Sequence, residues 1–510
     1  MSALFASALA MAGAWSLPAG EAAEPVASAP SAEAAPGQRD LALRWTGPVE
    51  VSAEAGPYEV VVRFDRPLDQ AEIDRFAKAA GPLLADLRWN DASLVLRPAA
   101  GNRIETARTA DGLAVHFIAD RDDAAPEPTP LVAPAPADTA ELALVRAQAD
   151  AAAGYPGQAR RRLMRLAAAE PDNASAQRAL GDAEAADGSL LAAARRYRAL
   201  GADDLPARRI MAEADGRTTG QLILRHGKTF TQWEAGLDGA MRAGDGLTLG
   251  GGIRQVTTTA NDVADATGLL ARVHDSATVG QIGATAFIGP WARLTAQVAS
   301  RLDRDGAGVM ARLVVGSTER QARLVAAWHL PDFSTAEQAH LGGSINRAGG
   351  GGTLRLSPEL VVQGDLAWTG YGLAGQGVPT TSLLASGGID YLVLRGRRSL
   401  QISYRLDAEY VRRMRLRGNG LAFIPLSDRE NHTVQAIFST ALHKVQVTAA
   451  AGWTWDRKGG SGPTASLGAV ANLGAAWRLE ASAGVSSVSR PAISGRQVYL
   501  QFTLTRFWRR

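Results

Sequence analysis

Cysteine is absent from the 510-residue sequence, and histidine occurs only seven times. The lack of cysteine excludes a disulfide framework, a thiolate zinc site and a cysteine nucleophile. The histidines are scattered without a metal-binding spacing, so the sequence predicts no metal and no cofactor. Beyond its start, the sequence has no stretch near the roughly 20 continuous apolar residues of a membrane-spanning helix. If this chain crosses a membrane, it must do so as a closed β-barrel.

Motifs for catalysis are also missing. There is no Gly-x-Ser-x-Gly nucleophile elbow, and the glycine run at 349–352 has no strand-to-helix context for a phosphate loop. The cluster Arg429-Glu-Asn-His432 is interpreted as a solvated loop or rim. We therefore expect no catalytic residue and no enzyme activity, and a barrel acyl hydrolase is the alternative to that view.

Lysine is rare, so arginine supplies most of the positive charge, and that charge is unevenly placed. From Arg217 onward there are 32 basic and 20 acidic residues, a balance of +12, whereas the first 216 residues carry 22 basic and 31 acidic, a balance of −9. The two parts therefore differ in electrostatic role. Clusters of basic and aromatic residues are missing, so no nucleic-acid partner is predicted.

The beginning of the sequence is typical of a secreted protein. An apolar stretch at 4–17, a proline and small residues up to Ala22 predict a signal peptide over 1–22, with a disordered Ala-rich tail as the alternative because no basic residue precedes Arg39. Residues 23–40 and 121–138 are Pro/Ala linkers. Between them, residues 41–120 combine short strand patterns with a helix at 69–80, which predicts a small α+β module.

Residues 139–216 show helical periodicity and an internal repeat of 34 residues. Ala149, Gly154 and Ala159 recur as Ala183, Gly188 and Ala193. The segment resembles two tetratricopeptide repeats, a scaffold for protein contacts. An ordinary pair of helical hairpins is the alternative, because such repeats usually stand in groups of three or more.

Residues 217–510 alternate between apolar and polar residues. Within 401–410, for example, Ile402, Tyr404 and Leu406 fall on one face while Arg405 and the other charged residues fall on the opposite face. The same pattern suits a soluble β-sandwich or propeller. Runs of about ten residues, aromatics near their ends and alternating long and short connections favour an outer-membrane β-barrel. At about 18 residues per strand and connection, the segment predicts about 16 antiparallel strands. Long loops are expected near 257–268, 371–380 and 456–463.

The order of these parts resembles the outer-membrane exporters of bacterial exopolysaccharides, of the cellulose, poly-N-acetylglucosamine and Pel type. The stretches 425–432, 452–457 and 489–510 are most similar to the Pel-type barrel. The resemblance covers about 139–510, with fewer repeats than those exporters carry. It implies a pore that exports a polysaccharide chain and helices that dock periplasmic or inner-membrane synthase components. The alternatives are a tetratricopeptide-barrel assembly factor that moves proteins or lipoproteins to the cell surface, and a solute porin.

Charged residues on barrel strands avoid lipid, because an arginine at the bilayer midplane costs about 2–4 kcal/mol. Polar residues on the predicted strands are therefore expected to line the lumen rather than to face the outer-membrane lipid. The predicted lumen-lining residues are Arg293, Arg301, Arg323, Gln363, Asp365, Arg405, Asp407 and Glu409. With the basic balance of this segment, they predict anion preference and a neutral or acidic substrate.

Overall fold

The computed structural model describes residues 38–44, 49–55, 59–68, 70–90, 92–109, 112–119, 139–265, 267–304, 306–487 and 496–508. The predicted signal peptide 1–22 and the linker 121–138 lie outside these residues. None of the helices in the described ranges is both long and apolar enough to cross a membrane. The chain divides after Asp187 into two compact units.

The first unit begins with two small antiparallel sheets. One has the order β1 (Gln38–Arg44), β7 (Gly112–Ala119), β6 (Asn102–Thr109); the other has the order β2 (Val51–Ala55), β3 (Val60–Phe64), β5 (Ser93–Pro98), β4 (Leu84–Asn90). Helix α2 (Gln70–Ala80) buries Ile73 and Phe76 in a core shared with both sheets. The linker predicted at 23–40 extends too far, because Gln38 already pairs with Ile118 in β7.

Five helices follow the sheets: α3 (Ala140–Ala152), α4 (Pro156–Ala169), α5 (Ala174–Ala186), α6 (Leu190–Ala199) and α7 (Leu205–Asp215). The side chains of Thr139 and Asn173 cap α3 and α5, which begin 34 residues apart, as the repeat predicts. Small residues such as Ala147, Ala159 and Ala176 are buried between α3, α4 and α5. The division after Asp187 falls inside the predicted segment 139–216, because α7 packs against strands of the second unit. That these helices are tetratricopeptide repeats stays a prediction.

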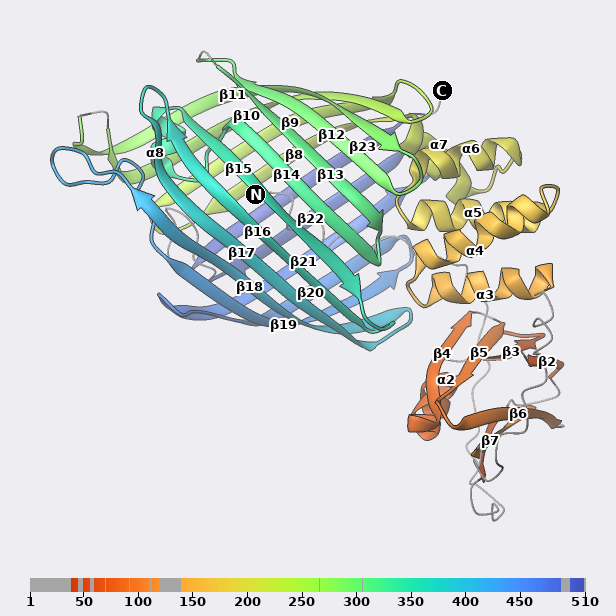
Figure 1. Cartoon of the computed structure of the whole chain (residues 1–510). Coiled ribbons are helices and arrows are strands. Elements are labelled where there is room, and N and C mark those ends of the chain that lie inside the picture. Colours follow the sequence, from red (N-terminus) through yellow and green to blue (C-terminus); the bar gives the residue numbers. More distant parts are fainter. Residues whose placement is uncertain are drawn as a thin grey trace, which may run out of the picture. The chain divides into compact units, whose positions relative to one another are not determined.

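The second unit is a closed antiparallel barrel of 16 strands, as the alternation predicts (Figure 1). Each strand pairs with its sequence neighbour, and β23 closes the barrel on β8. The strands are β8 (Gly216–His226), β9 (Phe230–Arg242), β10 (Leu247–Ala264), β11 (Leu270–Ile288), β12 (Ala292–Arg301), β13 (Ala307–Ser317), β14 (Arg320–Pro331), β15 (Gly343–Arg355), β16 (Leu360–Leu373), β17 (Gly377–Leu394), β18 (Arg398–Met414), β19 (Arg429–Leu442), β20 (Val445–Asp456), β21 (Ser461–Leu473), β22 (Trp477–Ser486) and β23 (Gln497–Phe507).

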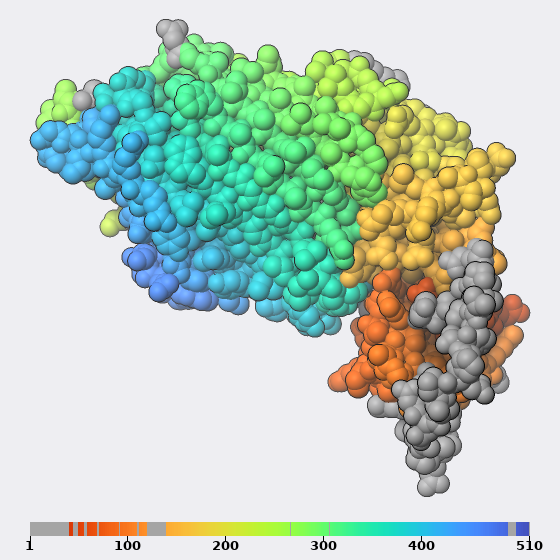
Figure 2. All heavy atoms as spheres, viewed as in Figure 1, coloured from red at the N-terminus to blue at the C-terminus, as the bar shows by residue number. Residues whose placement is uncertain are grey.

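The outer face of the barrel is apolar. Large side chains at alternate positions are exposed there, with Ile282 at 68% and Trp328 at 67%. The barrel wall appears in Figure 2 as the green-to-blue surface, continuous on the face in view. A water-soluble protein rarely exposes so large an apolar surface, whereas a membrane barrel needs one to contact lipid.

The two ends of the barrel differ. At the short-turn end, which α7 enters, each connection between strands has at most four residues. The opposite, long-loop end carries the connections 332–342 and 415–428, and 332–342 contains the short helix α8 (Ala336–Leu341) (Figure 1). The long loops expected at 257–268 and 371–380 are wrong, because strands occupy most of both segments. Outward polar residues such as Thr259 and His274 bond to each other across β10 and β11, so these strands continue past the apolar band.

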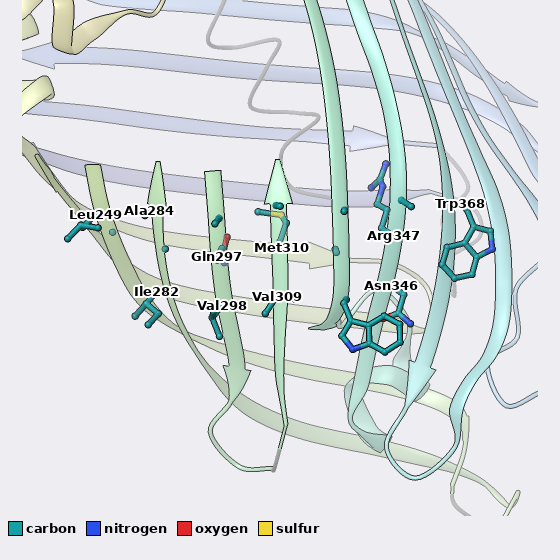
Figure 3. A pocket seen from close by; sticks show the side chains of 18 residues that line it. Leu249, Ile282, Ala284, Gln297, Val298, Val309, Met310, Asn346, Arg347 and Trp368 are labelled. Atoms are coloured by element: carbon teal, nitrogen blue, oxygen red, sulfur yellow. The ribbon is translucent and has the colours of Figure 1, made fainter. Parts of the chain in front are cut away.

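A shallow apolar groove crosses the outer face from β10 to β16. The strand register aligns five small residues in one outward row, and larger side chains such as Ile282, Val298 and Val309 stand beside that row (Figure 3). The aligned residues are Ala284, Ala296, Ala311, Ala326 and Ala348. Since the groove has almost no polar lining, it fits the acyl region of a bilayer.

Candidate functional site

The eight sequence-predicted residues lie on the inner face of their strands. In β16, Gln363 and Asp365 alternate with the exposed Leu366 and Trp368. In β12, Arg293 occupies the face opposite to the exposed Leu294. A barrel of 16 strands encloses an aqueous lumen, so these side chains form its polar wall.

Two of the predicted arginines are held by carboxylates across the wall. Arg323 makes a 2.9 Å ion pair with Asp365 and donates to Thr353 Oγ1 at 2.7 Å. Arg405 makes a 2.7 Å ion pair with Asp390 on β17, a residue that the sequence reasoning missed. These guanidinium groups bond to other residues of the wall, so few of their N–H donors are left for a passing ligand.

Glu409 is the centre of a buried polar network. It is 1% exposed in its side chain and accepts hydrogen bonds from Tyr371 Oη and Ser382 Oγ, each at 2.6 Å. Arg429 donates to the same carboxylate at 3.1 Å and lies 3.5 Å from Asp407. The network therefore joins β16, β17, β18 and β19.

The interpretation of Arg429-Glu-Asn-His432 as a solvated rim is wrong. Arg429 and Asn431 are buried at the start of β19. The preceding loop 415–428 covers this region, and its residues Ile424 and Leu426 pack with Tyr371. The sequence does not predict this burial, because it results from the path of the loop 415–428 in the tertiary structure.

The loop 332–342 folds into the long-loop end of the barrel. It connects β14 to β15, yet α8 contacts β10 and β11. Gln232 on β9 donates to the carbonyl of Phe333 at 3.1 Å, and Arg301 donates to the carbonyl of Ala339 at 3.3 Å. The guanidinium of Arg301 also lies 5.1 Å from the centre of the Phe333 ring. Arg301 therefore holds this loop, and it pairs with Asp303 at 2.8 Å.

Two ionisable side chains of α8 have opposite effects on the contact between the loop 332–342 and the barrel. His340 Nδ1 lies 2.6 Å from a carboxylate oxygen of Asp275 on β11. Glu337 is buried, one of its carboxylate oxygens has no hydrogen-bond partner, and the burial raises the pKa of its carboxyl group. The position of the loop 332–342 thus depends on charged groups and on packing.

A second loop crosses the same end of the barrel. Arg417 donates to the carbonyls of Ala264 and Asp265, and Asn419 donates to the carbonyl of Gly268 at 3.0 Å. These acceptors belong to the β10–β11 hairpin, which lies on the far side of the barrel from β18 and β19. Together, 332–342 and 415–428 narrow the long-loop end.

The short-turn end is joined to α7. Arg209 donates to the carbonyl of Gly474 at 3.2 Å, and Glu213 lies 3.7 Å from Arg478 on β22. Burial and the nearby Arg478 lower the pKa of Arg209. The last helix is therefore a fixed extension of the barrel wall.

The arrangement defines an outer-membrane β-barrel with a polar, partly narrowed lumen. No group of three or more potential metal-ligating residues exists within the described ranges. No family model matches the chain, and no curated protein matches it either.

Several solved structures are similar to the barrel. A bacterial polysaccharide outer membrane secretin aligns with 9% identity over 58% of this chain and 99% of its own, with a TM-score of 0.45. OccAB3 of Acinetobacter baumannii aligns with 8% identity over 57% and 98%, with a TM-score of 0.31. OmpT of Vibrio cholerae, with its loop L8 deleted, aligns with 10% identity over 58% and 98%, with a TM-score of 0.31.

The sequence reasoning also missed inward arginines whose strands carry the same alternation. On β13, Val309 and Val315 are exposed, which places Arg312 on the inner face. On β15, the exposed Leu354 places Arg347 on the inner face in the same way. The alternation of apolar and polar residues in these strands would have been enough to find both arginines.

Proposed function

We propose that this protein is an outer-membrane pore that exports an exopolysaccharide, and that its helices dock components of the synthesis or secretion machinery in the periplasm. The observation that carries the proposal is the polar inner wall, which runs from the short-turn end to the long-loop end. Its charged groups are mostly matched within the wall, as in Arg323–Asp365 and Arg405–Asp390.

Such a wall suits a sliding chain of sugar units. Hydroxyl groups of a glycan exchange hydrogen bonds with many serine, threonine and glutamine side chains at little net cost. Because no single site binds strongly, one contact is lost as the next one forms. Inward polar residues that offer such contacts include Thr219, Gln221, Gln297, Thr353, Gln363, Ser386, Gln435, Thr448, Ser466 and Gln501.

The helices support the docking part of the proposal. In outer-membrane barrels the short turns face the periplasm, and α7 is fixed at that end through Arg209 and Glu213. Helices α3 to α5 pack around small residues in the manner of a repeat scaffold. Partners bound there deliver the polymer to the pore.

A deletion strain tests this function. Loss of the gene is expected to remove the polysaccharide from the cell surface and to leave polymer in the periplasm, as measured by sugar analysis of both fractions. If the polysaccharide is unaffected while a surface lipoprotein is lost, the export proposal fails and the assembly-factor alternative holds. Restoration by the full chain is the control.

A further inference from the structure

Three arginines of the lumen wall have no hydrogen-bond or ion-pair partner among the described residues. Arg293 on β12, Arg312 on β13 and Arg347 on β15 form no hydrogen bond or ion pair with any residue of the described ranges. The Nε atom of Arg347 is buried without an acceptor. Arg293 and Arg312 are near enough to each other for their like charges to interact.

The strand register arranges these arginines as a rising diagonal. Arg293 lies opposite Val314, two residues from Arg312, so their Cα atoms are about 7–8 Å apart. Arg312 lies opposite Val325, and Val325 lies opposite Gly349, two residues from Arg347. From strand and residue spacing, Arg312 and Arg347 are about 12 Å apart. Long side chains bridge much of these gaps.

The diagonal runs from the short-turn end toward the long-loop end of the strands. Arg293 is the second residue of β12, near the short turn 289–291, and Arg347 is the fifth residue of β15 counted from its long-loop end. Arg312 lies at the middle of β13. Figure 3 shows Arg347 on β15, with Met310 on β13 and Gln297 on β12 in the same part of the wall.

Five carboxylates of the lumen wall lie beside arginines other than these three. Asp365 is paired with Arg323, Asp390 with Arg405, and Glu234 with Arg254. Asp407 and Glu409 both lie beside Arg429. The inner positions between the three arginines are Val314, Val325, Ala327 and Gly349, which carry no charge. A passing anion therefore meets no acidic side chain at the inner positions between these arginines.

We propose that Arg293, Arg312 and Arg347 form a binding track for the carboxylates of an acidic polysaccharide. This inference rests on the proposed export function and narrows its substrate to a polyanion. A guanidinium group presents a planar fork of donors that suits a carboxylate. In a water-filled lumen each ion pair is weak, so the polymer passes from one arginine to the next without stalling.

Binding of oligomers of polygalacturonate to the purified full chain in detergent tests the track. Calorimetry is expected to show at least about tenfold weaker binding for R293Q/R312Q/R347Q than for the native chain. The charge-retaining R293K/R312K/R347K variant is expected to keep most of the binding. The matched control D390N/R405Q removes a lumen ion pair without changing the net charge and is expected to bind like the native chain.

Conductance in planar bilayers separates this inference from the pore function. A conducting native barrel is expected to prefer anions and to be blocked by polygalacturonate. Neutral maltooligosaccharides should not block it, nor should monomeric galacturonate at equal carboxylate concentration. Both effects should be lost in R293Q/R312Q/R347Q, and R312Q alone should weaken them if the triple variant does not assemble.

Equal block by neutral and acidic oligomers, or block by the monomer alone, would overturn the polyanion track while leaving the pore intact. A native barrel that binds polygalacturonate but never conducts would support the track and count against the export pore.

Discussion

Glu409 and Arg429 show how much depends on single buried charges. Arg429 is 3% exposed in its side chain, and its carboxylate partner is 1% exposed. Removing the guanidinium leaves Glu409 with two hydroxyl donors, Tyr371 and Ser382, but without a compensating charge.

We expect R429M to destabilise the folded barrel by about 3–5 kcal/mol, because it leaves a buried charge unpaired. Urea unfolding followed by the heat-modifiable gel shift measures this change. The matched control is R457M, since Arg457 is 72% exposed and pairs with Glu430 near the surface. A loss of stability no larger than that of the control would mean that water enters the network.

Because Glu337 is buried, we expect the loop 332–342 to respond to pH. Burial raises its folded-state pKa above the usual value. Its contribution to stability is therefore present at low pH and is lost as the pH rises through that raised pKa. Arg417 and the Thr335 hydroxyl oppose the shift without cancelling it.

Hydrogen exchange of 332–342, corrected for the intrinsic rate, is expected to show weaker protection at pH 8 than at pH 5. In E337Q the protection at pH 8 should rise and the dependence on pH should shrink. E359Q, at a turn on the short-turn end, should behave as the native chain. If E337Q keeps the full pH dependence, Glu337 is not its cause.

The loop that contains α8 folds into the long-loop end of the barrel and packs against the inner side of its wall. Its Phe333 packs with Val256, Val279 and Ala299 on β10, β11 and β12. The barrel strands themselves pair with their neighbours without it. The loop therefore narrows the lumen without being part of the wall.

Replacement of residues 333–341 by two glycines is expected to raise the single-channel conductance severalfold, because a segment folded into this end of the barrel is gone. The barrel should stay folded and heat-modifiable. F333A should give a smaller increase, since it removes the ring between Arg254 and Arg301 but keeps the loop. Unchanged conductance in the deletion variant would locate the narrowest point at 415–428.

At the scale of the whole molecule, the helical segment divides into two parts. Helices α3 to α5 belong to the first compact unit, whereas α6 and α7 belong to the unit of the barrel. Arg198 on α6 pairs with Asp215 at the end of α7, and Glu213 faces Arg478 on the wall. Removal of α3 to α5 and removal of α6 and α7 are therefore expected to have different effects on the barrel.

Deletion of 139–187 is expected to leave a folded, heat-modifiable barrel in the outer membrane but to abolish secretion of the polysaccharide, because the docking surface is lost. Deletion of 188–215 should lower the thermal stability of the barrel, since wall contacts are lost. Membrane fractionation and surface sugar analysis measure both effects. Normal secretion without 139–187 would mean that these helices are only a spacer.

The sequence by itself determined the face on which each barrel side chain lies, because successive side chains of a strand point to opposite sides of the sheet. Ile402, Tyr404 and Leu406 had to face one way and Arg405 the other, whatever the rest of the chain did. The same rule gives the inner position of Arg293 and also of Arg312, which was overlooked. The 34-residue spacing of helices followed from a local repeat in the same manner.

Only the tertiary structure decided what the inner residues do. Arg301, Arg405 and Arg293 look alike in sequence, yet Arg301 holds the loop with α8 and Arg405 is paired with Asp390. The third has no partner in the part of the chain that the structure describes. These differences arise from strand register and from loops that cross the barrel end, which bring together residues far apart in the chain. Alternation fixes the face of a side chain through local geometry, whereas its partner depends on long-range packing that no local pattern encodes.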